Sequence, residues 1–375
     1  MWLKVSKDGD AGINLLWGND SGPYDPYHIG PGTLTAACGA ARAALTELVR
    51  LYGADEPRRR ARALRRLAAA GAELHYVLFN ALSNPNEAQS AKSAKNGLAA
   101  HYASSLEHKK RIANLRITGH PQIHVPWALV FEGNPDDLPS DRVDLAAYEG
   151  FWGLKYGLSS CSSGYNKPVV QLVRRVDRAK LLSLMHFAAA EQAEGNFSDE
   201  LKAAYAALRN LPVGVAHDLE TYTELIEKAV SYDTILYIFT HQENGKLDLG
   251  DEDPIGIIKF RMLLDRLAEQ SSDAPSYSLV ILNACESANG EMDYSFVSAI
   301  DRPGVCGSIG TESLIPRDFA ALFAIRFLTL MLAHGKSVGD AMALLRREPS
   351  LWPLSLAYGC YAHPDYRIEV NAASI

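Results

Sequence analysis

The second half of the chain alternates short apolar segments with amphipathic segments of helical length. From Val169 onward, apolar stretches that suit buried strands recur at 180–187, 213–216, 234–240, 277–284, 305–309 and 354–361. Segments that suit helices lie between them, at 198–209, 221–231, 255–269, 292–300 and 317–334. This alternation predicts a doubly wound α/β fold, in which a parallel sheet carries helices on both faces. The crossovers of such a sheet are right-handed, and its ligand site lies at the carboxyl ends of the strands.

The first half of the chain predicts another α/β unit, with a weaker pattern. Residues 12–17 suit a strand, and residues 34–51 and 58–70 suit helices. The segment 84–95 is rich in Asn, Ser, Ala and Lys, which predicts a loop or a frayed helix. A cluster of six arginines lies within 58–66, and we interpret it as a solvated helix face.

Length and composition limit the class of protein. A chain of 375 residues suits roughly two domains, and we expect one over 1–165 and one over 166–375. With 22% charged and 47% hydrophobic residues, the disordered and collagen-like classes are excluded. The net charge of -7 argues against nucleic acid or an anionic membrane as a direct partner.

The sequence also predicts a cytoplasmic protein. Charged residues interrupt the N-terminus where a secretory signal needs an apolar run, and the apolar stretch 319–333 contains Arg326. That stretch is shorter than the roughly 20 residues that span a bilayer. The five scattered cysteines fit a reducing compartment: Cys38, Cys161, Cys285, Cys306 and Cys360.

Two predicted strands are followed at once by residues that can take part in nucleophilic catalysis. His241 follows the strand 234–240, and Cys285 follows the strand 277–284. Neighbouring strands lie about 4.8 Å apart, so the imidazole and the thiol can face each other if these strands pair. A nearby imidazolium lowers the pKa of a thiol from about 8.5 toward roughly 3.5–7.5. The pattern therefore predicts a Cys/His dyad.

Each residue alone has a simpler interpretation. A single Cys285 is typical of a small buried core residue, and a single His241 is typical of a hydrogen-bonding residue at a strand end. Both positions are followed by polar and flexible residues, at 242–245 and 286–290. The two placements together favour the catalytic interpretation.

No cofactor and no metal site are predicted. The acidic segment 248–253 lacks the spacing of a calcium loop, and the three glycines within 304–310 lack the spacing of a dinucleotide-binding turn. Cys360 and His363 would supply only two zinc ligands.

Several segments resemble a known family in their order and spacing. They include the string Leu-Val-Ile-Leu-Asn-Ala-Cys-Glu-Ser at 279–287, the strand that ends before His241, the segments 307–316 and 319–332, the tail 353–365 and the Pro-containing strand entry at 123–130. Together they resemble the CHAT-domain family of caspase-like cysteine peptidases, in the clan of caspases, separases and gingipains. An amidase is disfavoured, because such enzymes usually present the cysteine on a Gly-flanked elbow ahead of the histidine.

The resemblance implies a fold and a mechanism. The fold would be a caspase-like three-layer α/β sandwich with a mostly parallel sheet, preceded by a related, degenerate α/β half. Cys285 would be the nucleophile and His241 its acid/base partner, through a thioester. The backbone N–H groups of Cys285 and Gln242 would hold the oxyanion. Family members usually carry Gly directly after the histidine, so Gln242 is a departure that narrows the site or restricts its backbone.

The resemblance also assigns two residues to substrate binding. Asn283, two before the nucleophile, and the neighbourhood of Glu312 would line the pocket for the substrate residue that precedes the cut, the P1 residue. A buried carboxylate prefers a cationic partner, which favours a basic P1 residue. Two alternatives stay open for Glu312, which are that it faces solvent or that it caps the helix beginning near Arg317.

Family membership would further imply partners. The expected substrate is a separate protein, such as a gasdermin-like or other effector protein, within a bacterial antiviral defence or signalling system. No repeat or sensor domain is recognisable in the sequence, so activation would come from a separate partner. The alternative is a catalytically silent CHAT-fold interaction or scaffold module, which Gln242 motivates.

Overall fold

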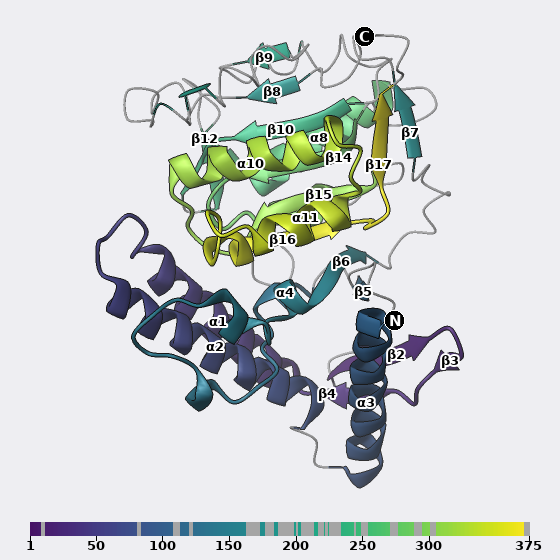
Figure 1. Ribbon diagram of the computed structural model, residues 1–375. Coiled ribbons are helices and arrows are strands. Elements are labelled where there is room, and N and C mark those ends of the chain that lie inside the picture. The colour runs from purple at the N-terminus through teal and green to yellow at the C-terminus, as the bar shows by residue number, and fades with distance from the viewer. Residues whose placement is uncertain are drawn as a thin grey trace. The chain divides into compact units, whose positions relative to one another are not determined.

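The computed structural model describes residues 1–8, 12–80, 84–107, 113–119, 123–162, 173–176, 184–186, 199, 202–203, 214–216, 221, 224, 234–243, 245–248, 254–270, 277–288, 295–300 and 305–370. The chain forms two compact units (Figure 1). One contains residues 1–164 and 342–359, and the other contains residues 165–341 and 360–375. The first unit therefore takes in a segment from the last part of the chain, whereas the sequence pattern predicts an uninterrupted domain over 166–375.

The first unit contains a mixed sheet. Its strands are β1 (Trp2–Asp8), β2 (Gly12–Asn19), β3 (Gly22–Pro23), β4 (Tyr27–Ile29), β5 (Ala113–Gly119) and β6 (Tyr156–Ser162). The order is β3-β2-β1-β5-β6, and β4 pairs with β2. β1 runs antiparallel to β2 and parallel to β5, and β5 runs parallel to β6. That this unit is a degenerate relative of the second stays a prediction.

Three long helices accompany this sheet. They are α1 (Pro31–Val49), α2 (Pro57–Phe79) and α3 (Pro85–Glu107). Each begins with a proline in its first turn, where the missing N–H costs no hydrogen bond. α2 buries its apolar side chains at helical spacing and leaves its arginines on the exposed and half-exposed side. The prediction of a solvated arginine face agrees with this placement.

Short elements complete the first unit. They are α4 (Trp152–Lys155) and the 3-10 turns η1 (Trp127–Leu129), η2 (Pro135–Asp137), η3 (Leu145–Tyr148) and η6 (Leu354–Ala357). The segment 123–130, which resembles a strand entry in the sequence, ends in the turn η1 instead of a strand.

The second unit contains the predicted parallel sheet. Its strands are β8 (Leu184–His186), β9 (Gly214–Ala216), β10 (Thr234–Phe239), β14 (Tyr277–Asn283), β15 (Gly307–Thr311) and β16 (Tyr358–Ala362). The first two residues of β16 are counted with the first unit and the other three with the second. They follow the order β16-β15-β14-β10-β8-β9. From β15 to β9 every pair is parallel. The α/β class and the mostly parallel sheet are therefore confirmed.

Helices cover both faces of this sheet. Alternate residues of β10 and β14 form a buried cluster with α8 (Ile257–Gln270) and α9 (Phe296–Ile300). The side chain of Asn283 points to the opposite face, where it contacts Ala320 of α10 (Arg317–Leu332). Figure 1 shows α10 crossing this face of the sheet. Helix, sheet and helix are the three predicted layers.

Smaller elements flank the central sheet. β11 (His241–Glu243), β12 (Lys246–Asp248) and β13 (Ile255–Gly256) form an antiparallel sheet directly after β10. β7 (Val173–Val176) pairs with β17 (Arg367–Val370), and α11 covers Val338–Arg347. The helices predicted at 198–209 and 221–231 fall mostly outside the described residues. Within the described part of the chain, no helix has the length and apolar character that crossing a membrane requires.

Candidate active site

The two predicted catalytic residues follow neighbouring strands. β10 and β14 pair in parallel, with Phe239 opposite Asn283 at their carboxyl ends. His241 and Cys285 each come two positions after these paired residues, so their backbones lie at the same edge of the sheet. The side chain of His241 lies outside the described part of the structure. Its contact with Cys285 therefore stays a prediction.

Cys285 begins a tight turn that β15 holds in place. Glu286 has a φ of 55°, a left-handed conformation that costs about 1–2 kcal/mol in a residue with a side chain. Its N–H donates to the carbonyl oxygen of Ser313 at 3.1 Å, and the N–H of Ala288 donates to that of Thr311 at 2.9 Å. These two hydrogen bonds fix the backbone of the residues that follow Cys285 in the chain.

The side chain of Ser287 ties the same turn to both strands. Its hydroxyl donates to the carbonyl oxygen of Leu282 at 3.0 Å and accepts from the N–H of Thr311 at 2.9 Å. The Thr311 hydroxyl in turn donates to the carbonyl oxygen of Ala284. Ser287 and Thr311 are fully buried. Strained backbone that is fixed from several sides is typical of functional sites.

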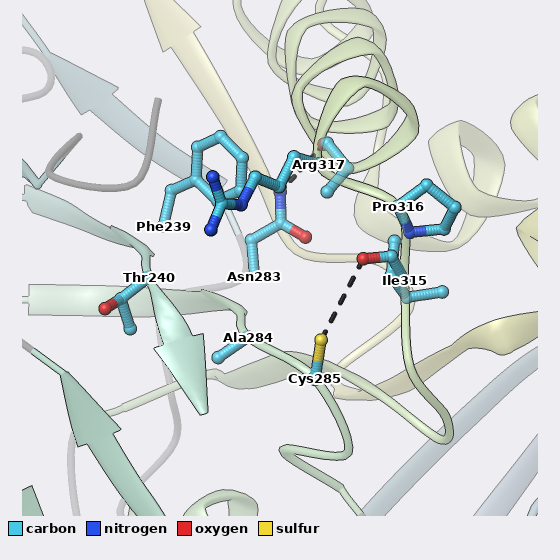
Figure 2. A pocket seen from close by; sticks show the side chains of 9 residues that line it. Phe239, Thr240, Asn283, Ala284, Cys285, Ile315, Pro316 and Arg317 are labelled. Carbon is cyan, nitrogen blue, oxygen red and sulfur yellow. Dashed lines mark hydrogen bonds between the residues drawn. The ribbon is translucent and has the colours of Figure 1, made fainter. Parts of the chain in front are cut away.

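The thiol of Cys285 is half-buried. Burial raises the pKa of the Cys285 thiol above its ordinary value. Its Sγ lies 3.9 Å from the carbonyl oxygen of Ile315, at weak hydrogen-bond distance (Figure 2). A nucleophilic role therefore requires a group that accepts the thiol proton or stabilises the thiolate.

A cavity of about 240 Å³ opens beside Cys285 (Figure 2). Its walls come from the ends of β10 and β14 and from the loop that leads into α10. The lining residues are Phe239, Thr240, Asn283, Ala284, Cys285, Ile315, Pro316, Arg317 and Ala320. The cavity places a largely apolar binding space next to a thiol.

The predicted oxyanion donors occupy different settings. The N–H of Cys285 donates to no other described residue, but it interacts with the thiol of Cys285 itself and acts to lower its pKa. Its role as an oxyanion donor stays a prediction. Gln242 lies in β11 opposite Leu247, and its Oε1 is buried without a donor among the described residues. The role of the Gln242 N–H stays a prediction.

Of the two predicted substrate-binding residues, only Asn283 reaches the cavity. Its amide donates to the hydroxyl of Tyr237 at 3.1 Å and to the carbonyl oxygen of Ala320 at 2.7 Å. Glu312 is 1% exposed, accepts a hydrogen bond from the hydroxyl of Tyr361 and does not line the cavity. It neither faces solvent nor caps α10, whose N-cap residue is Pro316.

The resemblance places the substrate pocket in the neighbourhood of Glu312, and the residues that line the cavity follow Glu312 in the chain. They are Ile315, Pro316 and Arg317, of which the sequence names only Arg317, as the start of a helix. The turn that brings them to Cys285 is a property of the tertiary fold, and the order of residues carries no signal for it. Among the described residues, no group of three or more His, Cys, Asp or Glu side chains is arranged to hold a metal ion.

Comparisons with known proteins agree with the sequence motifs. The model of the CHAT domain matches residues 42–349, which is most of the chain. No curated protein sequence matches. A chain in the crystal structure of the Saccharomyces cerevisiae separase–securin complex is similar at 11% identity and a TM-score of 0.42, over 92% of this chain. The chain spans about a quarter of that protein, since 23% of it is covered. The extent of the domain match shows that the chain belongs to the CHAT-domain family.

Proposed function

We propose that the chain is a cysteine endopeptidase in which Cys285 is the nucleophile and His241 the acid/base partner. One observation carries this proposal: the two residues follow neighbouring parallel strands, and a cavity lies beside the thiol. The raised pKa of the Cys285 thiol gives His241 a defined task, which is to remove the thiol proton.

The reaction follows from these roles. His241 takes the thiol proton, and the Cys285 sulfur attacks the carbonyl carbon of the substrate. The N–H groups of Cys285 and Gln242 stabilise the oxyanion. When the C–N bond breaks, His241 gives its proton to the leaving amine and a thioester remains. Water then hydrolyses the thioester, which releases the carboxylic acid and restores the thiol.

The proposed substrate is a separate protein, cleaved within a bacterial defence or signalling system. A gasdermin-like or other effector protein is the substrate class that family membership favours, with activation by a separate partner. The competing function is a catalytically silent module that binds the same partner. Two features favour that alternative: Gln242 stands where the family usually has Gly, and burial raises the pKa of the Cys285 thiol.

Covalent labelling tests the proposal. The protein is exposed to peptidyl acyloxymethyl ketones, which alkylate activated cysteines, and the intact mass is measured. The proposal predicts one adduct, which Cys285→Ala abolishes and which Cys306→Ala and Cys360→Ala retain. The two controls are buried cysteines of the same unit that do not line the cavity. Absence of an adduct from folded wild-type protein, both alone and with the products of neighbouring genes added as candidate activators, would favour the silent module.

A further inference from the structure

Among the described residues that line the cavity beside Cys285, one is charged, Arg317. The other lining residues are apolar or neutral and polar. Phe239, Ile315 and Pro316 provide apolar walls around the thiol (Figure 2). A side chain bound here therefore meets an apolar surface and a single positive charge.

The guanidinium of Arg317 has no hydrogen bond or ion pair with any described residue. Arg317 is exposed at the first helical position of α10. Figure 2 shows its side chain extending from the start of the helix toward Phe239. An arginine that no described residue engages has its donors open to a ligand, and its planar fork suits a carboxylate.

The described acidic residues near the cavity do not offset the positive charge of Arg317. The sequence predicts a basic P1 residue because of Glu312. Glu312, however, does not line the cavity, and its carboxylate accepts a hydrogen bond from the hydroxyl of Tyr361. Glu286 influences the thiol electrostatically, but it too is absent from the lining, and Asp318 follows Arg317 at an exposed position. A basic ligand in the cavity would bring a second cation to Arg317.

The cavity is placed to receive the P1 side chain. During acylation the carbonyl carbon of the P1 residue is bonded to Sγ of Cys285, so its side chain stays within a few bonds of the sulfur. The residue on the other side of the cut leaves with the amine. Cys285 itself forms part of the cavity wall. The P1 side chain, which stays attached to Cys285 in the thioester, is therefore the side chain that enters the cavity.

We propose that Arg317 makes the enzyme selective for an acidic P1 residue, with aspartate or glutamate paired to the guanidinium. This inference rests on the proposed peptidase function. It reverses the basic preference expected from the sequence, because the structure puts Arg317 and not Glu312 at the cavity. Arg317 acts as a specificity residue, and Asn283 shapes the floor through its hydrogen bonds to Tyr237 and Ala320.

Three matched probes test the inference. They are peptidyl acyloxymethyl ketones that carry Asp, Asn or Arg at P1 and are otherwise identical. The rate of Cys285 adduct formation is measured by intact mass. Asp and Asn have nearly the same shape, so the ratio of the rates of the Asp and Asn probes reports the effect of the negative charge. We expect the Asp probe to react at least about tenfold faster than the Asn probe, and the Arg probe to react slowest.

Variants assign the preference to Arg317. Arg317→Gln should bring the Asp/Asn ratio to near one, and Arg317→Glu should make the Arg probe faster than the Asp probe. Arg326→Gln, on the same helix but outside the cavity, is the matched control and should keep the wild-type ratio. Thermal unfolding of each variant checks that it is folded.

The outcomes separate this inference from the proposed function. Adducts on Cys285 without a preference for Asp over Asn would overturn the role of Arg317 and leave the peptidase proposal standing. If Arg317→Gln slows all three probes equally, the specificity role of Arg317 is also overturned and the peptidase proposal stands, since Arg317 would then act on the thiol. If no probe reacts, with or without the products of neighbouring genes added as candidate activators, while iodoacetamide still alkylates Cys285, both proposals fail.

Discussion

The N–H of Thr311 donates to the hydroxyl of Ser287 at 2.9 Å, and this hydrogen bond joins β15 to the turn that carries Cys285. The Ser287 hydroxyl also donates to the carbonyl oxygen of Leu282, the residue three before the nucleophile. One buried side chain thus connects β14, the catalytic turn and β15. The nucleophile is positioned by the core of the unit and does not depend on a surface loop.

Replacing Ser287 should loosen this turn. Ser287→Ala leaves the buried N–H of Thr311 without its side-chain acceptor, which costs about 1–3 kcal/mol in the free energy of unfolding. Urea unfolding measures the loss. Ser298→Ala, which removes a local hydrogen bond from α9 to the carbonyl oxygen of Ser295 just before the helix, is the control and should cost less. Equal stability of the two variants would show that Ser287 does not hold the turn.

Gly307 should tolerate no side chain. Its φ is 138°, and an added Cβ would lie 2.1 Å from the carbonyl oxygen of Tyr361 and 2.4 Å from Cα of Ala362. The positive φ and the close backbone contacts both oppose Gly307→Ala. We therefore expect this substitution to lower the free energy of unfolding by about 3 kcal/mol or more. Gly335 also has a positive φ, of 59°, but nothing lies within 4 Å of the added Cβ. Gly335→Ala should lower the melting temperature much less, and similar losses would contradict the steric argument.

The catalytic layer of the fold was predictable because its signals are local. β10, β14 and α10 lie close to their expected ranges, since apolar runs bounded by polar residues mark buried strands. α3 was expected as a loop or frayed helix, because 84–95 is rich in Asn, Ser and Lys. Burial of Ala91, Ala94 and Leu98 shows that tertiary packing overrides this local composition.

The rest of the candidate site depends on distant parts of the chain. Arg317 lines the same cavity as Cys285 because of the turn after β15. Glu312, five residues before Arg317 in the sequence, does not line the cavity. The segment 342–359 belongs to the first unit, although its residues 342–347 lie in α11, which begins in the second unit. Nothing in the order of residues indicates either result, because both are set by long-range packing.

Gln242 should slow acylation. It follows His241 at the position where the family usually has Gly, and its buried Oε1 has no donor among the described residues. Gln242→Gly gives the backbone N–H the freedom to turn toward the oxyanion, so the adduct with a peptidyl ketone should form faster. Lys246→Gly, in the paired strand of the same hairpin, should not change the rate. An unchanged or slower rate in Gln242→Gly would show that the glutamine is accommodated.

His75 should make the stability of the first unit depend on pH. It is buried against the rings of Phe79 and Trp152, and burial lowers the pKa of His75 to about 4. Below pH 6.5 the unfolded chain gains a proton that the folded state does not take up until about pH 4. The free energy of unfolding should therefore fall by up to about 3 kcal/mol between these values and stay flat above them. His75→Leu should remove this part of the pH dependence, and an unchanged profile would contradict the burial argument.

The pH dependence of Cys285 alkylation tests the proposed dyad most directly. Iodoacetamide reacts with the thiolate, so the rate of Cys285 modification, followed by peptide mass mapping, reports the pKa of the thiol. The described surroundings raise that pKa. In His241→Ala the rate should therefore rise only above the ordinary thiol value of about 8.5. In the wild type, the imidazolium of His241 should move the midpoint to a lower pH, and coincident profiles would show that the two residues do not form a dyad.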